Sequence, residues 1–233
     1  ASPTNSWVEV DYLTVCYPNI VSTGDSICEG QRWTNGDVTW QKHCPIWQEV
    51  RNNLIVNKGV GGRTSEEIYD NIGSATQTRA KLCILHTSTN DFGLSVSTGT
   101  RTAMTQNSIN ALKAAGMQVV LLNSIYYSSA PALAYMKGWW DSNRLSLTGV
   151  DLAVNIMAVL KNGGDDYVNT SLTLDGLHPN AAGNTAIGGQ IEPLITYTAP
   201  TPVTPPLYYE AGNNGTAGTL TPTAGNGADA PHG

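Results

Sequence analysis

The sequence predicts an α/β protein whose sheet is mainly parallel and is covered by helices on both faces. Short apolar runs rich in β-branched residues alternate with segments of helical spacing as far as about Thr198. Strands that alternate with helices pair in parallel, because each crossover returns the chain to the same edge of the sheet. A chain of 233 residues, 40% of them apolar, is long enough for one domain of this kind with a full core.

The expected strands are short and apolar, and the first ends at a glycine. Residues 19–23 form a β-branched run that stops at Gly24, which is typical of a buried strand reaching a turn. The further strands are expected at 54–57, 82–87 and 117–124. His86 is expected to be a residue of the third strand.

The expected helices are marked by spacing and by their ends. Residues 46–52 have helical spacing behind Pro45, and residues 64–67 read Thr-Ser-Glu-Glu, a capping box that opens a short helix. A helix over 103–115 is stopped by Gly116. Further helical segments are expected at 139–160, with an interruption near Gly149, and at 180–197, with a break at Pro193.

The composition changes after residue 198. Residues 200–206 form a Pro/Thr spacer, and residues 213–233 are rich in Gly, Ala, Asn and Thr, with almost nothing to bury. The predicted division is therefore a folded domain over 1–198 and a linker with a poorly ordered tail over 199–233.

Composition and charge exclude several partners. The net charge is −6, and the twelve Lys and Arg residues are scattered, so neither nucleic acid nor an anionic membrane is an expected partner. No run approaches the roughly 18 apolar residues of a membrane span, and no signal segment opens the chain, so we expect a mature or engineered start. Only 13% of residues are charged, which favours a secreted, periplasmic, virion or cell-surface protein. The oligomeric state stays open.

The cysteines give no metal or redox motif. None of the cysteines at 16, 28, 44 and 83 belongs to a C-x-x-C pair, so zinc and redox chemistry are not expected. A bridge between Cys28 and Cys44 and a set of buried free thiols are both compatible with this spacing.

Two glycine-containing segments follow expected strands. Gly24-Asp25-Ser26 comes directly after the first strand, where a turn can expose the serine hydroxyl and free its amide, although most such tripeptides are ordinary turns. Residues 59–64 read Gly-Val-Gly-Gly-Arg-Thr and precede the capped helix. A free amide there favours a developing negative charge, whereas a flexible loop is the simpler interpretation.

Two polar segments complete the set. Ser88-Thr89-Asn90-Asp91 follows the third strand, where the Asn90 amide can donate to an oxyanion or simply close an Asx-turn. Asp175 and His178 lie three residues apart before the last helix. This spacing lets the carboxylate accept the Nδ1 proton while Nε2 takes a proton from a serine; a solvated loop histidine is the alternative.

Taken together and in this order, the four segments resemble the four sequence blocks of the SGNH (GDSL-type) hydrolases. The resemblance covers residues 19–198 and implies a flavodoxin-like three-layer α/β/α sandwich. It implies Ser26 as nucleophile, His178 as base and Asp175 as its orienting residue, with an oxyanion hole made by the amides of Ser26 and Gly62 and the side chain of Asn90. The third block of the family usually begins with glycine, where this chain has Ser88. We assign Asp25 a structural role in the turn.

The resemblance implies a serine esterase that forms an acyl-enzyme and needs no metal or cofactor. The expected partner is an ester substrate, and an acetylated carbohydrate is favoured because the chain has six Trp and only one Phe. Aromatic residues expected to bind the substrate are Trp33, Trp40, Tyr126 and Trp139, with core packing as the alternative for each. A general lipase, arylesterase or thioesterase, and a glycan-binding module of a cell-surface or phage tail assembly with little catalysis, remain alternatives.

Overall fold

The computed structural model describes residues 20–30, 55–126, 129–163 and 166–194, together with two short strands in the C-terminal part of the chain. The chain separates into two compact units, Ala1–Ile195 and Thr196–Gly233. The first unit carries all of the residues of the four motifs. The predicted helix over 46–52 lies outside the described residues.

The first unit is built on a five-stranded parallel sheet. Its strands are β1 (Ile20–Thr23), β2 (Ile55–Asn57), β3 (Leu82–His86), β4 (Gln118–Leu122) and β5 (Leu152–Val154), in the spatial order β2-β1-β3-β4-β5. Every pair is parallel; in the central pair Ile20 lies opposite Leu82 and Thr23 opposite Leu85. The order confirms the predicted α/β class with a parallel sheet.

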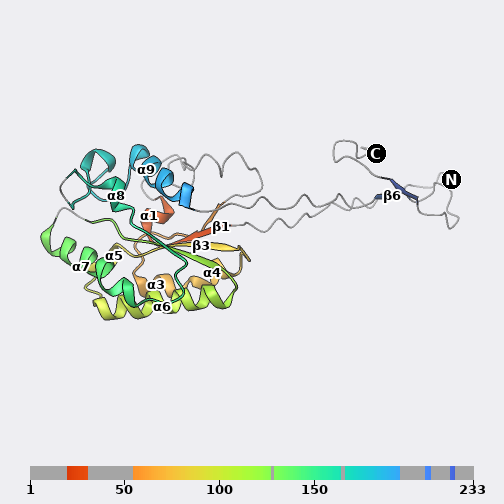
Figure 1. Ribbon diagram of the computed structural model, residues 1–233, viewed down its shortest axis with the longest axis horizontal. Coiled ribbons are helices and arrows are strands. Elements are labelled where there is room, and N and C mark those ends of the chain that lie inside the picture. The colour runs from red at the N-terminus through yellow and green to blue at the C-terminus, as the bar shows by residue number, and fades with distance from the viewer. Residues whose placement is uncertain are drawn as a thin grey trace, which may run out of the picture. The chain divides into compact units, whose positions relative to one another are not determined.

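Helices cover both faces of this sheet, as Figure 1 shows. On one side lie α1 (Ser26–Glu29), α8 (Met157–Leu160) and α9 (Ala181–Ile191). On the other lie α3 (Ser65–Asp70), α4 (Ile72–Thr76), α5 (Asn90–Gly93), α6 (Thr98–Ala114) and α7 (Ala130–Asp141). Short 3₁₀ turns lie at Asn143–Ser146, Thr170–Leu172 and Glu192–Leu194.

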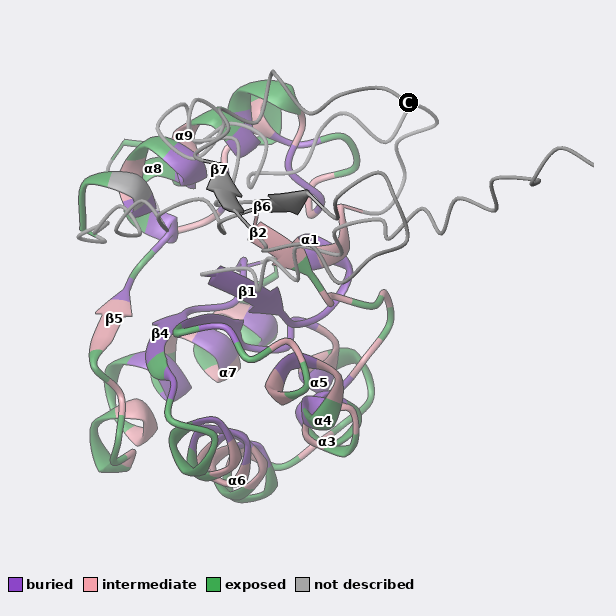
Figure 2. Cartoon of the chain, turned by 90° about the vertical axis from the view of Figure 1, so that its right-hand side faces the viewer, coloured by how far each residue is buried: buried purple, intermediate pink, exposed green. Residues whose placement is uncertain are grey.

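Alternation along the strands divides the core into two clusters, one for each face. Ile84 and Leu122 pack with Ile187 of α9, whereas neighbouring Leu85 and Leu121 belong to the cluster that contains α3 and α6 residues. Burying both faces in this way is typical of a parallel sheet. Figure 2 shows the buried residues on the strands and on the sheet-facing sides of the helices.

The structure corrects one predicted helical segment and confirms the predicted break at Pro193 in another. The segment predicted as an interrupted helix over 139–160 contains the end of α7, the edge strand Leu152–Val154 and the short α8. An apolar stretch of three residues carries too little periodicity to distinguish an edge strand from a helix. The last helix ends at Ile191 and continues as a 3₁₀ turn through Pro193, because proline lacks the amide that a further helical turn requires.

The α6 helix begins earlier than its sequence signal. It starts at Thr98 rather than at residue 103, because the Ser97 side chain caps it by accepting from the amide of Thr100. The capping box at Thr64 is confirmed: Thr64 accepts from the amide of Glu67, and the Glu67 carboxylate accepts from the amide of Thr64.

In the second unit, the structure describes one pair of strands. Strands β6 (Tyr208–Glu210) and β7 (Thr221–Thr223) are antiparallel, with Tyr208 opposite Thr223. The Gly/Ala/Asn/Thr-rich composition of this region did not predict strands. The interpretation of residues 199–233 as a linker and tail stays a prediction.

Within the part of the chain that the structure describes, no helix has the length and apolar character needed to cross a bilayer.

The strand order determines where a site can form. Strands β1 and β3 are neighbours at the centre, but the chain passes first to β2 on one side and later to β4 on the other. In open parallel sheets of this order, ligands bind beyond the carboxyl ends of the strands at such a switch point. Ser26 follows β1, and Asn90 follows β3.

The packing of the loop after β2 predicts a difference between two glycines. A Cβ at Gly59 would lie 2.5 Å from the amide nitrogen of Glu29, whereas a Cβ at Gly73 would meet nothing within 4 Å. We expect Gly59→Ala to lower the free energy of unfolding by about 1–3 kcal/mol, because backbone atoms must shift to make room. Gly73→Ala is the matched control, and we expect it to be neutral or slightly stabilising. Urea unfolding of both variants measures the difference; equal stabilities would contradict this packing.

Candidate active site

A tight turn between β1 and α1 presents Ser26. Gly24 has φ +157°, and a Cβ there would lie 2.8 Å from the Cβ of His86, so only glycine lets the end of β1 lie directly on β3. Asp25 caps α1 by accepting from the amide of Ile27 at 3.0 Å. Ser26 is therefore the first residue of α1, and only 6% of it is exposed.

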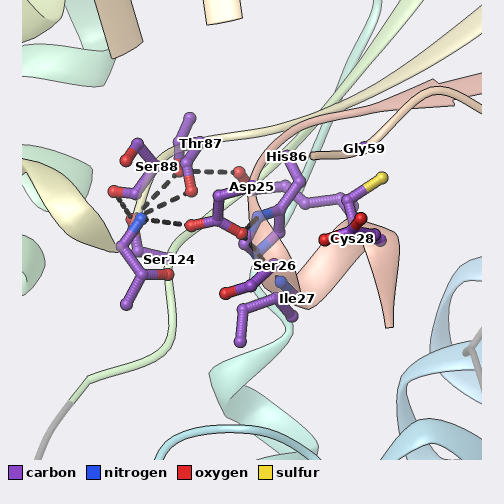
Figure 3. A network of polar contacts seen from close by, with 12 residues as sticks. Asp25, Ser26, Ile27, Cys28, Gly59, His86, Thr87, Ser88 and Ser124 are labelled. Atoms are coloured by element: carbon purple, nitrogen blue, oxygen red, sulfur yellow. Dashed lines mark hydrogen bonds and ion pairs between the residues drawn. The ribbon is translucent and has the colours of Figure 1, made fainter. Parts of the chain in front are cut away.

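Asp25 joins this turn to the loop after β3, as the close-up in Figure 3 shows. Its second oxygen accepts from the amide of Thr89 at 2.6 Å, and its first lies 3.2 Å from Nδ1 of His86. Burial alone would raise the pKa of this fully buried carboxyl. Attraction to the His86 ring, together with donation from the amides of Thr89 and Ile27, outweighs burial and lowers the pKa. Asp25 therefore has the structural role that the sequence predicts.

His178 and Asp175 complete a linear chain of polar contacts with Ser26. Nε2 of His178 lies 3.0 Å from Oγ of Ser26, and Nδ1 lies 2.9 Å from Oδ2 of Asp175. A proton on Nδ1 that faces the carboxylate leaves Nε2 to accept from the serine hydroxyl. The structure thus brings Ser26 together with His178, which lies 152 positions later in the sequence, and with its neighbour Asp175.

The loop that carries His178 is closed at its base. Thr173 and Pro179 form an antiparallel bridge, and the amide of Leu174 donates to the carbonyl of His178 at 2.8 Å. Gly176 adopts φ +81° at the tip, a left-handed conformation that favours glycine. Asp175 also accepts from the amide of His178 at 2.8 Å, so the carboxylate and the ring are held as one unit.

The pKa of Asp175 follows from this geometry. Partial burial would raise it, but donation from the amide and the ring of His178, attraction to that ring and donation from the amide of Leu177 outweigh burial and lower it. The contact therefore stabilises the folded protein at pH values above 3.8, the ordinary pKa of an aspartate. This stabilisation is lost as the pH falls through the lowered pKa of Asp175.

The glycine loop after β2 packs against α1. The amide of Val60 donates to the carbonyl of Gly24 at 3.0 Å, and the amide of Gly61 donates to the Glu29 carboxylate at 2.7 Å. Gly62 is exposed with φ +78°, and its amide donates to no other residue in the described part of the chain. The loop therefore leaves this amide available beside the serine turn.

The Asn90 segment is attached to the glycine loop through one carbonyl. Nδ2 of Asn90 donates to the carbonyl of Arg63 at 3.0 Å, and the hydroxyl of Ser88 donates to the same oxygen at 2.7 Å. Ser88 also accepts from the amide of Asn90 at 3.0 Å. The serine at this position is fully buried and is held by these contacts, so the segment accommodates a side chain where the family usually has glycine.

A buried ion pair lies beneath the Asn90 segment. Asp91 accepts from the amide of Ser65 at 2.8 Å, and its other oxygen lies 3.6 Å from Nε of Arg101. Arg101 also donates to Ser124 and stacks 4.2 Å from the centre of the Trp139 ring. Burial raises the pKa of Asp91, although attraction to Arg101 opposes it. This support was not predicted from the sequence, because no local pattern links Asp91 to Arg101.

The structure corrects two of the predicted substrate-binding aromatics. Trp139 is 1% exposed, covered by Arg101, and its indole N–H donates to Thr102. Tyr126 is 3% exposed and accepts from Asn123. Both rings belong to the core and offer no open face to a sugar. Trp33 and Trp40 lie outside the described residues.

The described cysteines are buried thiols. Cys28 donates to Asn57 at 3.6 Å, and burial raises the pKa of Cys83. Cys16 and Cys44 lie outside the described residues. In the described ranges, no three metal-ligating side chains converge.

The sequence did not indicate two supporting residues, Glu29 and His86. Glu29 follows Ser26 on α1, but its contact with the glycine loop depends on how β2 returns beside β1. His86 lacks a carboxylate at close sequence spacing, and its contact with Asp25 arises from the pairing of β1 with β3. The arrangement as a whole can accept a proton from Ser26 and return it, which is the basic requirement of nucleophilic acyl transfer.

The sequence model of the GDSL-like Lipase/Acylhydrolase family matches residues 23–186, which include all four motifs. No curated protein matches the chain significantly.

Solved structures share the fold. A candidate lipolytic protein of the G-D-S-L family from Desulfitobacterium hafniense DCB-2 is 16% identical, with a TM-score of 0.64 over 76% of this chain and 98% of that one. A GDSL-like lipase from Bacteroides thetaiotaomicron is 17% identical, with a TM-score of 0.59 over 75% and 86%. A catalytic mutant of Axe2, an acetylxylan esterase from Geobacillus stearothermophilus, is 16% identical, with a TM-score of 0.62 over 74% and 91%. At these identities the likeness is one of fold.

The contacts of Asp175 predict its titration. In the wild-type protein, NMR titration of the Asp175 side-chain carbonyl should give a pKa below the ordinary 3.8. His178→Ala should move this pKa towards the ordinary value, because the ring N–H is lost while the backbone donors remain. Asp151, whose lowered pKa depends on Val119 and Lys113, is the internal control and should not move. An unchanged Asp175 pKa in His178→Ala would contradict the contact.

Proposed function

The chain belongs to the GDSL-like lipase/acylhydrolase family, and from this premise we propose that it is a serine esterase that uses Ser26, His178 and Asp175. The observation that carries the proposal is the contact chain from Ser26 Oγ to His178 and on to Asp175, at 3.0 and 2.9 Å. It lies at the switch point of the parallel sheet, where this fold binds its ligands.

The proposed reaction has two steps. Ser26 Oγ attacks the ester carbonyl while its proton passes to Nε2 of His178. The tetrahedral intermediate collapses, the C–O bond to the alcohol breaks, and His178 donates the proton to the departing oxygen. Water then attacks the acyl-enzyme with His178 again as base, which releases the acid and restores Ser26. Asp175 holds the ring and stabilises its charged form.

The proposed oxyanion hole consists of the amides of Ser26 and Gly62 and the side chain of Asn90. Ser26 is the first residue of α1, so its amide has no partner within the helix. The Gly62 amide is available, and Asn90 uses one of its two side-chain N–H groups on Arg63. Three such donors would stabilise the charge that develops on the carbonyl oxygen.

A short acyl group on a carbohydrate is the substrate that we favour. Ser26 and His178 are 6% and 9% exposed, so the reacting atoms present only a small surface to a substrate. Axe2, which shares the fold, is named an acetylxylan esterase. The low content of charged residues, 13%, fits action outside the cytosol.

Acetate release from a panel of acetylated polysaccharides, alongside nitrophenyl esters of increasing chain length, tests both parts of this proposal. If the natural acyl group is acetyl, we expect turnover to fall as the acyl chain lengthens. Faster cleavage of long-chain esters would favour a lipase, and preference for thioesters would favour a thioesterase.

Ser26→Ala and His178→Ala are the matched variants for these assays. Each should lower turnover by several orders of magnitude, roughly 10⁴-fold or more, because nucleophile and base act as one unit. Circular dichroism should show an intact fold for both. A Ser26→Ala protein that keeps a tenth of wild-type turnover would contradict the assignment.

Asn90→Ala separates an oxyanion donor from a turn residue. If Asn90 donates to the oxyanion, turnover should fall by about 10²–10³-fold while KM changes little, since the full charge exists only in the transition state. If the side chain merely holds Arg63, thermal stability should fall and turnover per folded molecule should stay near wild type. Melting temperature and kcat measured on one preparation distinguish the two; unchanged kcat would remove Asn90 from the site.

A further inference from the structure

His86 is a polar residue in an interior position where an apolar residue would pack at lower cost. It is the last residue of β3, it is 1% exposed, and it follows Ile84 and Leu85 in the core. Its Nε2 has no hydrogen-bond partner among the described residues. An unsatisfied buried polar atom destabilises a fold by about 1–3 kcal/mol, so its presence requires a reason.

Among the described residues, His86 approaches the Asp25 carboxylate. Nδ1 lies 3.2 Å from Oδ1 of Asp25, an ion-pair distance, although the ring N–H is not aligned well enough for a hydrogen bond. Asp25 is 0% exposed, and a buried carboxylate needs compensating donors or charge. The amides of Ile27 and Thr89 supply two of these, and His86 is the remaining side chain that approaches it.

Asp25 in turn determines the spacing of the reacting groups. One oxygen holds the amide of Ile27, directly after the nucleophile, and the other holds the amide of Thr89, directly before Asn90. The carboxylate thus links the nucleophile to the proposed oxyanion donor, and His86 lies beside that link. Gly24 also packs closely on His86, since a Cβ at position 24 would lie 2.8 Å from the Cβ of His86.

We propose that His86 is a positioning residue of the esterase reaction, which acts through Asp25 to hold the Ser26 turn and the Asn90 segment at their catalytic separation. The inference rests on the proposed function. His86 is 1% exposed and acts only through Asp25 in this proposal. A displacement of about 1 Å at the reacting atoms is enough to cost roughly 10²-fold in rate.

The test compares His86→Leu with His86→Gln, and Ile84→Val serves as the matched control in the same strand. We expect His86→Leu to fold with a lower melting temperature than wild type, because it removes the side chain that lies 3.2 Å from the buried Asp25 carboxylate and leaves that carboxylate in place. At a temperature where the variant is fully folded, its kcat should fall about 10- to 100-fold, with KM within about threefold of wild type. His86→Gln, which retains a donor, should recover most of that loss, and Ile84→Val should leave kcat unchanged.

A double-mutant cycle identifies the route of the effect. In an Asp25→Asn background, His86→Leu should cost less than about threefold, since the carboxylate through which it acts is already gone. Equal losses in both backgrounds, a wild-type kcat in His86→Leu, or a His86→Gln protein as slow as His86→Leu would each overturn the inference.

Amide hydrogen exchange gives a readout that does not depend on turnover. The amide of Thr89 should exchange faster in His86→Leu than in wild type or Ile84→Val, because Asp25 is then held less firmly. Faster exchange in His86→Leu, together with a wild-type protein that shows no Ser26-dependent hydrolysis, would overturn the proposed function and leave the structural link intact. Unchanged exchange in an active enzyme would overturn the role of His86 alone.

Discussion

The Asp25 carboxylate is the contact on which the rest of the site depends. Burying an ionised carboxylate is unfavourable unless donors surround it. Here one donor follows β1 and the other follows β3. The amides of Ile27 and Thr89 therefore have a fixed distance between them. Because β1 and β3 are hydrogen-bonded neighbours, Asp25 also fixes the separation between the turn after β1 and the loop after β3. The fold and the site are constrained by the same few atoms.

A second attachment joins the remaining loop. The Arg63 carbonyl accepts from both Asn90 and Ser88, and Glu29 holds the amide of Gly61. The glycine loop is thus fixed on one side to α1 and on the other to the segment after β3. An oxyanion site needs donors that do not reorganise during the reaction, and attachment from two sides provides that rigidity.

The sequence predicted those features whose signals are local. The capping box at Thr64 and the three-residue spacing of Asp175 and His178 were found because each depends on residues within one turn of the chain. The fold class followed from the alternation of apolar runs. The edge strand Leu152–Val154 was missed, because a three-residue strand has no periodicity of its own. The placement of Trp139 at the substrate was wrong, because a ring covered by a buried arginine carries the same sequence signal as an exposed one.

The residues that sequence reasoning could not find all act across the sheet. His86 contacts Asp25, and Arg101 contacts Asp91, only because parallel pairing brings the ends of separate strands together. No spacing along the chain encodes either pair. Each is also a buried polar contact, which stabilises a fold less than an apolar packing of equal volume would. Their presence directly behind the reacting groups therefore indicates that this region is organised for the geometry of the site, at some expense of stability, and not for the strength of the core.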